Sequence, residues 1–170
     1  MLTPEQEAWI NTLSDRIISI SPYDPHSQVL FRRVQKKIHS LLGEDVLVEQ
    51  SGSTIFEIAG QNEVDVVIVV PKNKFPEYIP KLEAVYGPVR SNYPDRARFE
   101  VKEDEKKIDL KIVDVHHPNY TEGKVFEDYI KAHPEDVERF RILKEQSNGL
   151  TTKEYYRKKI EFINEILAKA

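Results

Sequence analysis

The sequence contains no cysteine in its 170 residues, which excludes disulfide bonds, thiolate metal ligands and cysteine nucleophiles. It has no apolar run near the roughly 18 residues that a membrane-spanning helix needs. The first residues, Met1 to Glu7, include acidic side chains and lack the apolar core of a signal peptide. We therefore expect a cytoplasmic protein that does not bind membranes.

An excess of basic charge is also missing, because the formal net charge is −4. A general nucleic-acid binder needs a strongly basic surface, so the composition carries no strong signature of that function. The chain likewise lacks the Walker Gly-Lys-Ser/Thr loop, the Gly-x-Ser-x-Gly elbow and the His-Glu-x-x-His motif. With 39% hydrophobic and 32% charged residues it is typical of a soluble globular protein, and its length predicts a single domain over residues 1–170.

Apolar periodicity predicts helices at both ends of the chain and strands in the middle. The predicted helices cover residues 4–17, 27–42, 54–60, 75–86, 122–132, 134–146 and 152–168. The predicted strands cover 45–50, 64–70, 97–103 and 107–115, the last two as an antiparallel hairpin. In the last helix the residues expected on a common face are Tyr156, Ile160, Ile163 and Leu167.

The order of these elements predicts N-terminal helices (1–43), a sheet core (44–116) and C-terminal helices (121–170). Helices would then enclose a small mixed β-sheet. The expected fold class is therefore α+β or α/β.

Two carboxylates open the most apolar strand of the chain. Glu63 and Asp65 lie two residues apart, so strand alternation places them on one face, ahead of the aliphatic run from Val66 to Val70. Asp109 lies in the second hairpin arm and would join them if that arm paired with their strand. Such a cluster predicts metal ligands for Mg²⁺ or Mn²⁺, because nucleotidyl transfer uses two cations about 4 Å apart. The alternative is that Glu63 and Asp65 occupy an exposed strand end.

A Gly52-Ser53 turn precedes this strand. Glycine lets the backbone approach a triphosphate, and the Ser53 hydroxyl with neighbouring amides can bind phosphate oxygens. Arg98 in the first hairpin arm either binds phosphates through its guanidinium or faces solvent. Lys111 shares a face with Asp109 and is either a phosphate contact or a salt-bridge partner of the acids.

Four residues near the C-terminus are further candidates for nucleotide binding. His133 precedes Pro134 at a helix junction, where it either caps a helix or contacts the nucleotide. Tyr155 and Lys159 are four residues apart and share a helix face, so the tyrosine could stack on a base while the lysine reaches the triphosphate. Lys144 on the preceding helix is assigned to the same pocket. The alternative is that these lysines are solvated.

Several short motifs extend over residues of about 20 to 170. They are Pro22-Tyr23-Asp24-Pro25 with Phe31, Gly52-Ser53-Thr54, Asp65 in its strand, Phe126 to Pro134 with Lys144, and Tyr155, Lys159 and Phe162-Ile163. Together they resemble the GrpB family of the nucleotidyltransferase superfamily. The resemblance implies a nucleotidyltransferase-like fold and adds Thr54 to the substrate-binding residues.

The chain also departs from the family pattern at three places. Ile55 to Gly60 replaces a proline-containing loop, Glu63 adds an acid, and Asp109-Leu110-Lys111 stands where family members often have His-x-His. These changes bring the chain closer to the general metal-binding pattern of the superfamily.

We therefore predict a metal-dependent nucleotidyltransferase that moves a nucleoside monophosphate from a nucleoside triphosphate to an acceptor hydroxyl. Glu63, Asp65 and Asp109 would be its catalytic residues and metal ligands. The acceptor is a small molecule, an RNA or a protein. The alternative, suggested by the resemblance, is a non-catalytic nucleotide- or cofactor-binding or regulatory module linked to coenzyme A metabolism.

Overall fold

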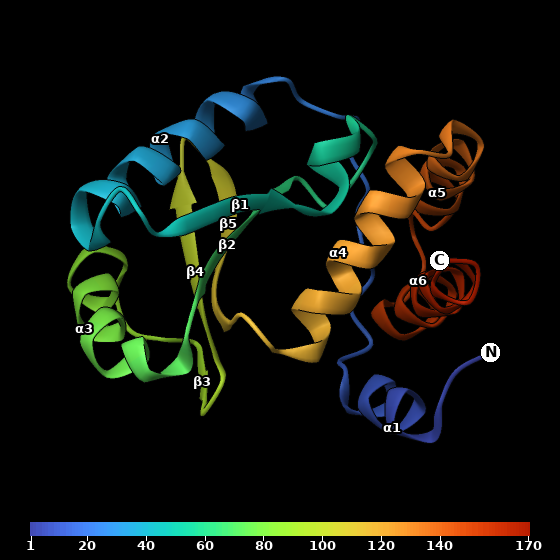
Figure 1. The fold of residues 1–170 in the computed structure, drawn as a ribbon. Coiled ribbons are helices and arrows are strands. Elements are labelled where there is room, and N and C mark those ends of the chain that lie inside the picture. The colour runs from blue at the N-terminus through green and yellow to red at the C-terminus, as the bar shows by residue number, and fades with distance from the viewer. The chain divides into compact units, whose positions relative to one another are not determined.

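The computed structural model describes residues 1–170 (Figure 1). The helices are α1 (Pro4–Thr12), α2 (His26–Leu42), α3 (Phe75–Tyr86), α4 (Pro118–Lys131), α5 (Pro134–Gln146) and α6 (Thr152–Leu167), with 3-10 helices η1 (Gly52–Phe56) and η2 (Lys72–Lys74). The strands are β1 (Leu47–Ser51), β2 (Glu63–Val70), β3 (Ser91–Tyr93), β4 (Arg96–Glu103) and β5 (Lys106–Asp114). The predicted α+β class is confirmed. None of the helices is both long enough and apolar enough to cross a membrane.

The chain forms two compact units. The sheet unit comprises Tyr23–Glu57 and Asn62–Thr121, and the helical unit comprises Met1–Pro22, Ile58–Gln61 and Glu122–Ala170. The single domain expected over residues 1–170 stays a prediction, because compactness alone does not test whether either unit folds independently.

The sheet unit contains one five-stranded sheet in the order β1-β2-β5-β4-β3. β2 and β5 are parallel, and the other neighbouring pairs are antiparallel. The predicted hairpin is confirmed as β4 and β5, joined at Asp104 and Glu105, which both have positive φ angles as a two-residue hairpin turn requires. The short edge strand β3 was not predicted, because three residues are too few to show an alternating pattern.

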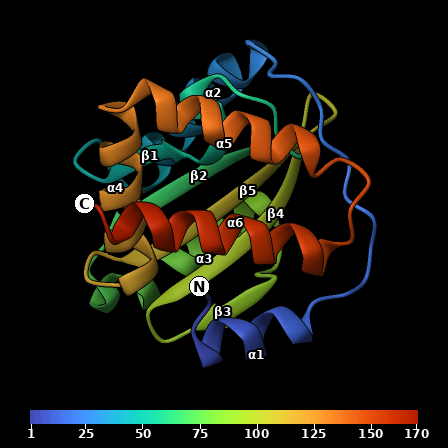
Figure 2. The ribbon, with the colours of Figure 1, turned by 90° about the vertical axis from the view of Figure 1, so that its right-hand side faces the viewer.

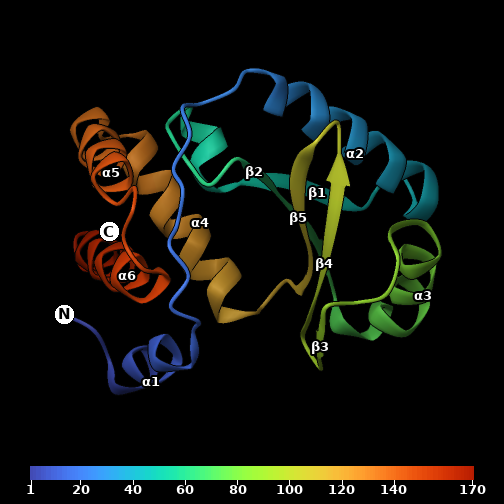
Figure 3. The ribbon, with the colours of Figure 1, turned by 180° about the vertical axis from the view of Figure 1, so that it is seen from behind.

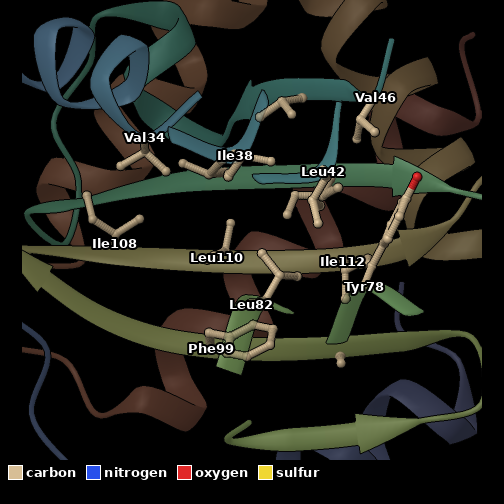
Figure 4. Packing of buried hydrophobic residues seen from close by; sticks show 14 of the residues in the cluster. Val34, Ile38, Leu42, Val46, Tyr78, Leu82, Phe99, Ile108, Leu110 and Ile112 are labelled. Atoms are coloured by element: carbon tan, nitrogen blue, oxygen red, sulfur yellow. The ribbon is translucent and has the colours of Figure 1, made fainter. Parts of the chain in front are cut away.

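Helices α2 and α3 cover one face of this sheet (Figures 1 and 3). Apolar residues recur every four positions in α2, so its stripe of Val34, Ile38 and Leu42 faces the strands. Figure 4 shows these side chains packed with Leu110 and Ile112 of β5. Strand alternation then directs the intervening polar residues of β2 and β5 to the opposite face. The core therefore fixes which face carries the acids.

Asp24, from the Pro-Tyr-Asp-Pro motif, ties the start of α2 to the hairpin turn. Its Oδ1 accepts a hydrogen bond from the His26 backbone amide (2.9 Å), and its Oδ2 accepts one from the Lys106 Nζ (2.6 Å). Lys106 is buried and also donates to the Ser27 hydroxyl. This motif has a structural role in the sheet unit.

The helical unit contains α1, α5, α6 and most of α4. Phe126, Phe140 and Phe162 form its aromatic cluster, with ring centroids 5.3 to 6.2 Å apart. Figure 2 shows α5 and α6 side by side. A capping box between Thr151 and Glu154 begins α6.

Two sequence-based expectations for this unit are wrong. The first helix ends at Thr12, because Leu13 is extended, and Ile17 is 66% exposed and makes an isolated bridge with Thr151. The fully buried residues of α6 are Tyr155, Phe162 and Ile166, whereas the expected face is only partly buried. Helical periodicity alone did not separate two neighbouring apolar stripes on this helix.

Candidate functional site

Asp65 and Asp109 lie directly opposite each other on the parallel strands β2 and β5. The same cross-strand row continues to Ser51 on β1 and Glu100 on β4. Paired residues project to the same side of a sheet, so this row lies on the face away from α2 and α3. The second hairpin arm therefore pairs with the acidic strand, which is the condition under which the acids were expected to converge.

Lys111 joins the two aspartates. Its Nζ lies 2.9 Å from the Asp65 Oδ1 and 3.0 Å from the Asp109 Oδ2. These are distances of charge-assisted hydrogen bonds. Of the two roles considered for Lys111, the structure contains the salt bridge to the acids.

The charge state of Lys111 follows from the same contacts. Burial by itself lowers the pKa of the Lys111 ammonium, but Asp65 and Asp109 raise it by more, so it lies above the ordinary value. Lys111 therefore remains a cation at neutral pH.

Other basic side chains pair with the remaining acids of this face. The Arg98 Nε donates to the Asp109 Oδ1, and the Arg90 guanidinium pairs with Glu100. The Lys107 Nζ lies 3.1 Å from the Glu63 Oε2. The charge of the carboxylates is thus balanced by the chain's own cations.

A divalent cation such as Mg²⁺ needs several oxygen ligands around one point. No group of three or more His, Cys, Asp or Glu side chains is arranged to hold a metal ion. Glu63 pairs with Lys107, one row away from the two aspartates. However, the Asp65 and Asp109 carboxylates flank a single point, and hard oxygen donors of this kind are what Mg²⁺ and Mn²⁺ take. The chemistry of these carboxylates fits the metal, and the Lys111 ammonium lies between them.

The Gly52 turn lies against Asp65. Gly52 has a φ of 76°, and a Cβ at this position would overlap the Asp65 Oδ2 and lie 3.1 Å from its Cγ. Only glycine allows this approach without strain. Ser53 lies next in η1, beside the site.

Thr54 has a structural contact in the same turn. Its hydroxyl accepts a hydrogen bond from the Gln50 Nε2 (2.9 Å), and its carbonyl accepts one from the Gln28 side chain. The buried Thr54 therefore fixes η1, and its predicted contact with substrate stays a prediction.

Three residues of this face were missed in the sequence. Lys107 could have been found, because it lies two residues before Asp109 and must share its face. The Tyr120 hydroxyl donates to the Glu49 Oε2 (2.8 Å), and Tyr120 packs on Val67 and Val113. Glu49 and Tyr120 are 71 positions apart in the sequence, so no local pattern joins them.

The remaining candidates, His133, Lys144, Tyr155 and Lys159, belong to the helical unit. The His133 ring stacks on Tyr129 at 4.0 Å, and its Nδ1 lies 2.7 Å from the Tyr129 carbonyl oxygen at the end of α4. This is the capping position expected as one of its two roles.

Lys144 and Tyr155 are both buried, and the Lys144 Nζ donates to the Tyr155 hydroxyl at 3.2 Å. The Lys159 Nζ lies 5.6 Å from the ring centroid of Tyr156. Binding of a nucleotide by these residues stays a prediction.

Comparison with solved structures finds a similar fold that extends over nearly the whole chain. The conserved protein GrpB from Enterococcus faecalis matches with a TM-score of 0.67 and 18% identity, covering 88% of this chain and 98% of that one.

Two further matches are more distant. The Leishmania infantum polymerase beta in a ternary P/T complex has a TM-score of 0.44 and 12% identity, covering 74% of this chain and 63% of that one. The STING-associated CdnE c-di-GMP synthase from Capnocytophaga granulosa has a TM-score of 0.39 and 20% identity, covering 56% and 36%. With TM-scores below 0.5, neither decides the chemistry of this chain.

Among proteins with curated descriptions, none matches the sequence. The family model described as GrpB protein matches residues 17–169, nearly the full length. The chain therefore belongs to the GrpB protein family.

Proposed function

We propose that this protein is a metal-dependent nucleotidyltransferase, which transfers a nucleoside monophosphate from a nucleoside triphosphate to an acceptor hydroxyl. The observation that carries the proposal is the direct pairing of Asp65 with Asp109 beside the Gly52 turn. Nucleotidyl transfer needs carboxylates that converge from neighbouring strands next to a phosphate-binding turn. Membership of the GrpB family is consistent with this chemistry.

The proposed metal is Mg²⁺ or Mn²⁺, held by Asp65 and Asp109 with Glu63 from the next row. When bound, it would neutralise charge on the phosphates and polarise the reacting oxygens. Asp109 would also accept the proton of the acceptor hydroxyl. These assignments use the carboxylates that the sheet already brings to one face.

The triphosphate would be held by the Ser53 hydroxyl and the backbone amides of the η1 turn. Arg98 and Lys111 lie beside the aspartates and would donate to phosphate oxygens, which suits guanidinium and ammonium groups. His133, Lys144, Tyr155 and Lys159 of the helical unit remain proposed nucleotide contacts. The acceptor would be a small molecule, an RNA or a protein in the cytoplasm.

A second candidate function is nucleotide or cofactor binding without turnover, as a regulatory module linked to coenzyme A metabolism. The observation that favours it is the Lys111 ammonium between Asp65 and Asp109, which already balances their charge. If Lys111 stays there permanently, the site would bind phosphates through its basic side chains and would not turn over.

A melting scan with each of the four NTPs, with and without Mg²⁺ or Mn²⁺, tests both functions. A ligand that binds only the native state at about 100 times its Kd adds roughly 2.7 kcal/mol of stability. The transferase is supported by a shift in melting temperature that needs both nucleotide and metal and is lost in Asp65→Asn. Pyrophosphate release under the same conditions is also expected. Binding without turnover supports the second candidate. No shift with any nucleotide contradicts the transferase and the binding of nucleotides by a regulatory module.

A further inference from the structure

Lys111 occupies the point that a metal ion shared by Asp65 and Asp109 would take. Its ammonium hydrogen bonds to one oxygen of each carboxylate, at 2.9 and 3.0 Å. An ammonium and a divalent cation cannot occupy this point together, because both need the same oxygens and their charges repel. The point between the two aspartates is therefore filled by a cation of the chain itself.

The Lys111 side chain is not part of the buried core of the sheet unit. It is 35% exposed, in contrast to the 3% exposed side chain of Asp109. Lysine carries its charge on a flexible four-carbon stem, so the ammonium can move while the stem stays on the sheet. Arg98 holds the other oxygen of Asp109, the Oδ1, so Asp109 stays paired when Lys111 moves away.

We propose that Lys111 is a displaceable counter-ion, which balances the charge of Asp65 and Asp109 when no metal is bound, competes with divalent metal for them, and moves to the nucleotide phosphates when the metal binds. This inference rests on the proposed function, because it assumes that these aspartates are metal ligands. It explains how the adjacent carboxylates are kept together without mutual repulsion before a metal binds. It also predicts that the protein binds metal weakly in the absence of nucleotide.

The test measures the binding of Mn²⁺ to the protein without added nucleotide. Electron paramagnetic resonance reports the binding, because the signal of the free ion disappears when Mn²⁺ binds. Lys111→Met keeps the length and apolar character of the stem and removes the charge. It is expected to bind Mn²⁺ at least about tenfold more tightly than the wild type, which corresponds to about 1.4 kcal/mol.

Lys102→Met is the matched control, because it removes the same charge from the exposed Lys102 on the neighbouring strand β4. Its affinity for Mn²⁺ is expected to equal that of the wild type within about twofold, since Lys102 pairs with neither aspartate and solvent screens its exposed charge. Asp65→Asn in the Lys111→Met background is expected to abolish the gain, which identifies the site. Circular dichroism checks that each variant is folded.

Two results would overturn the proposal in distinguishable ways. Wild-type protein that binds Mn²⁺ together with a nucleotide, with no gain in Lys111→Met, contradicts the role of Lys111 and leaves the proposed function standing. No Mn²⁺ binding to any variant, with or without nucleotide, contradicts the metal-dependent function and this inference with it. An equal gain in Lys102→Met would show a general charge effect and would also contradict the role of Lys111.

Discussion

Asp65 and Asp109 face each other directly across the parallel strands β2 and β5, and one ammonium, that of Lys111, bonds to both. The aspartates lie 44 positions apart in the sequence but at the same level of the sheet. Strand register thus places two acids and one base at a single point.

Replacing Asp109 by asparagine is expected to reduce nucleotidyl transfer by on the order of 100-fold or more, since the variant loses the proposed base. The fold should persist, because asparagine has the same shape and Lys111 keeps its bond to Asp65. Pyrophosphate release measures the activity, and circular dichroism measures the fold. Glu100→Gln is the control in the same row of the sheet, and an equal loss of activity there would contradict a special role for Asp109.

Gly52→Ala is expected to destabilise the protein by about 1–2 kcal/mol, the usual cost of a left-handed backbone for a residue with a Cβ. The new methyl group would also displace the Asp65 carboxylate, which it overlaps. Urea unfolding gives the stability. Gly123→Ala should have the opposite effect, about 0.8–1 kcal/mol of stabilisation, because Gly123 lies inside α4 with open space at its Cβ. Equal effects of both changes would rule out the close approach of Gly52 to Asp65.

Tyr86→Phe is expected to raise the free energy of unfolding by about 1 kcal/mol, because the buried Tyr86 hydroxyl has no hydrogen-bond partner. Burial, and then the charge of Glu103, raise the pKa of Tyr86 to about 12 from 10.0. The folded state thus favours the neutral phenol. Tyr86 therefore leaves the free energy of unfolding unaffected by pH below pH 10, and ionisation of the phenol lowers this free energy as the pH rises towards 12.

Ultraviolet absorbance during alkaline titration should therefore show a late-titrating tyrosine that is absent from Tyr86→Phe. The exposed Tyr93 provides the control: Tyr93→Phe should change stability by no more than about 0.5 kcal/mol and retain the late titration. A destabilised Tyr86→Phe would mean that the hydroxyl has a favourable interaction after all.

Asp24→Asn is expected to lower the urea midpoint more than Lys106→Met does. Removing the carboxylate leaves the buried Lys106 ammonium with only the Ser27 hydroxyl, whereas removing the lysine leaves Asp24, whose side chain is 45% exposed. The reverse order would show that Lys106 does not depend on Asp24 for its charge.

The same pair predicts a dependence on pH. Hydrogen bonds from the Lys106 side chain and the His26 amide lower the pKa of Asp24 below its ordinary 3.8. This group therefore stabilises the fold above its ordinary pKa, and the contribution is lost as the pH falls through the lowered value. Acid unfolding of Lys106→Met should show a smaller loss over this range, because the main cause of the shift is gone.

Local patterns in the sequence were sufficient for most elements. α2, α3, α5 and the β4–β5 hairpin agree with prediction because each has clear periodicity and a proline, glycine or charged turn at its ends. The first helix and the buried face of α6 were wrong, because Leu13 and Ile17 extend an apolar pattern into an extended segment and α6 has two adjacent apolar stripes. Tertiary packing determines where the first helix ends and which face of α6 is most buried, and local sequence patterns carry no information about it.

In the candidate site, too, local pattern determines some features and tertiary packing determines the others. The sequence by itself determined that Glu63 and Asp65 share one face of their strand and that Asp109 and Lys111 share one face of theirs, because side chains alternate with a period of two. Only the tertiary structure decided that Asp65, and not Glu63, lies opposite Asp109, with Lys111 bonded to both. A shift of two residues in the register of β2 against β5 would leave every side chain on the same face of the sheet but would give Asp109 a different partner on β2. The observed register therefore depends on how the whole sheet packs against α2 and α3.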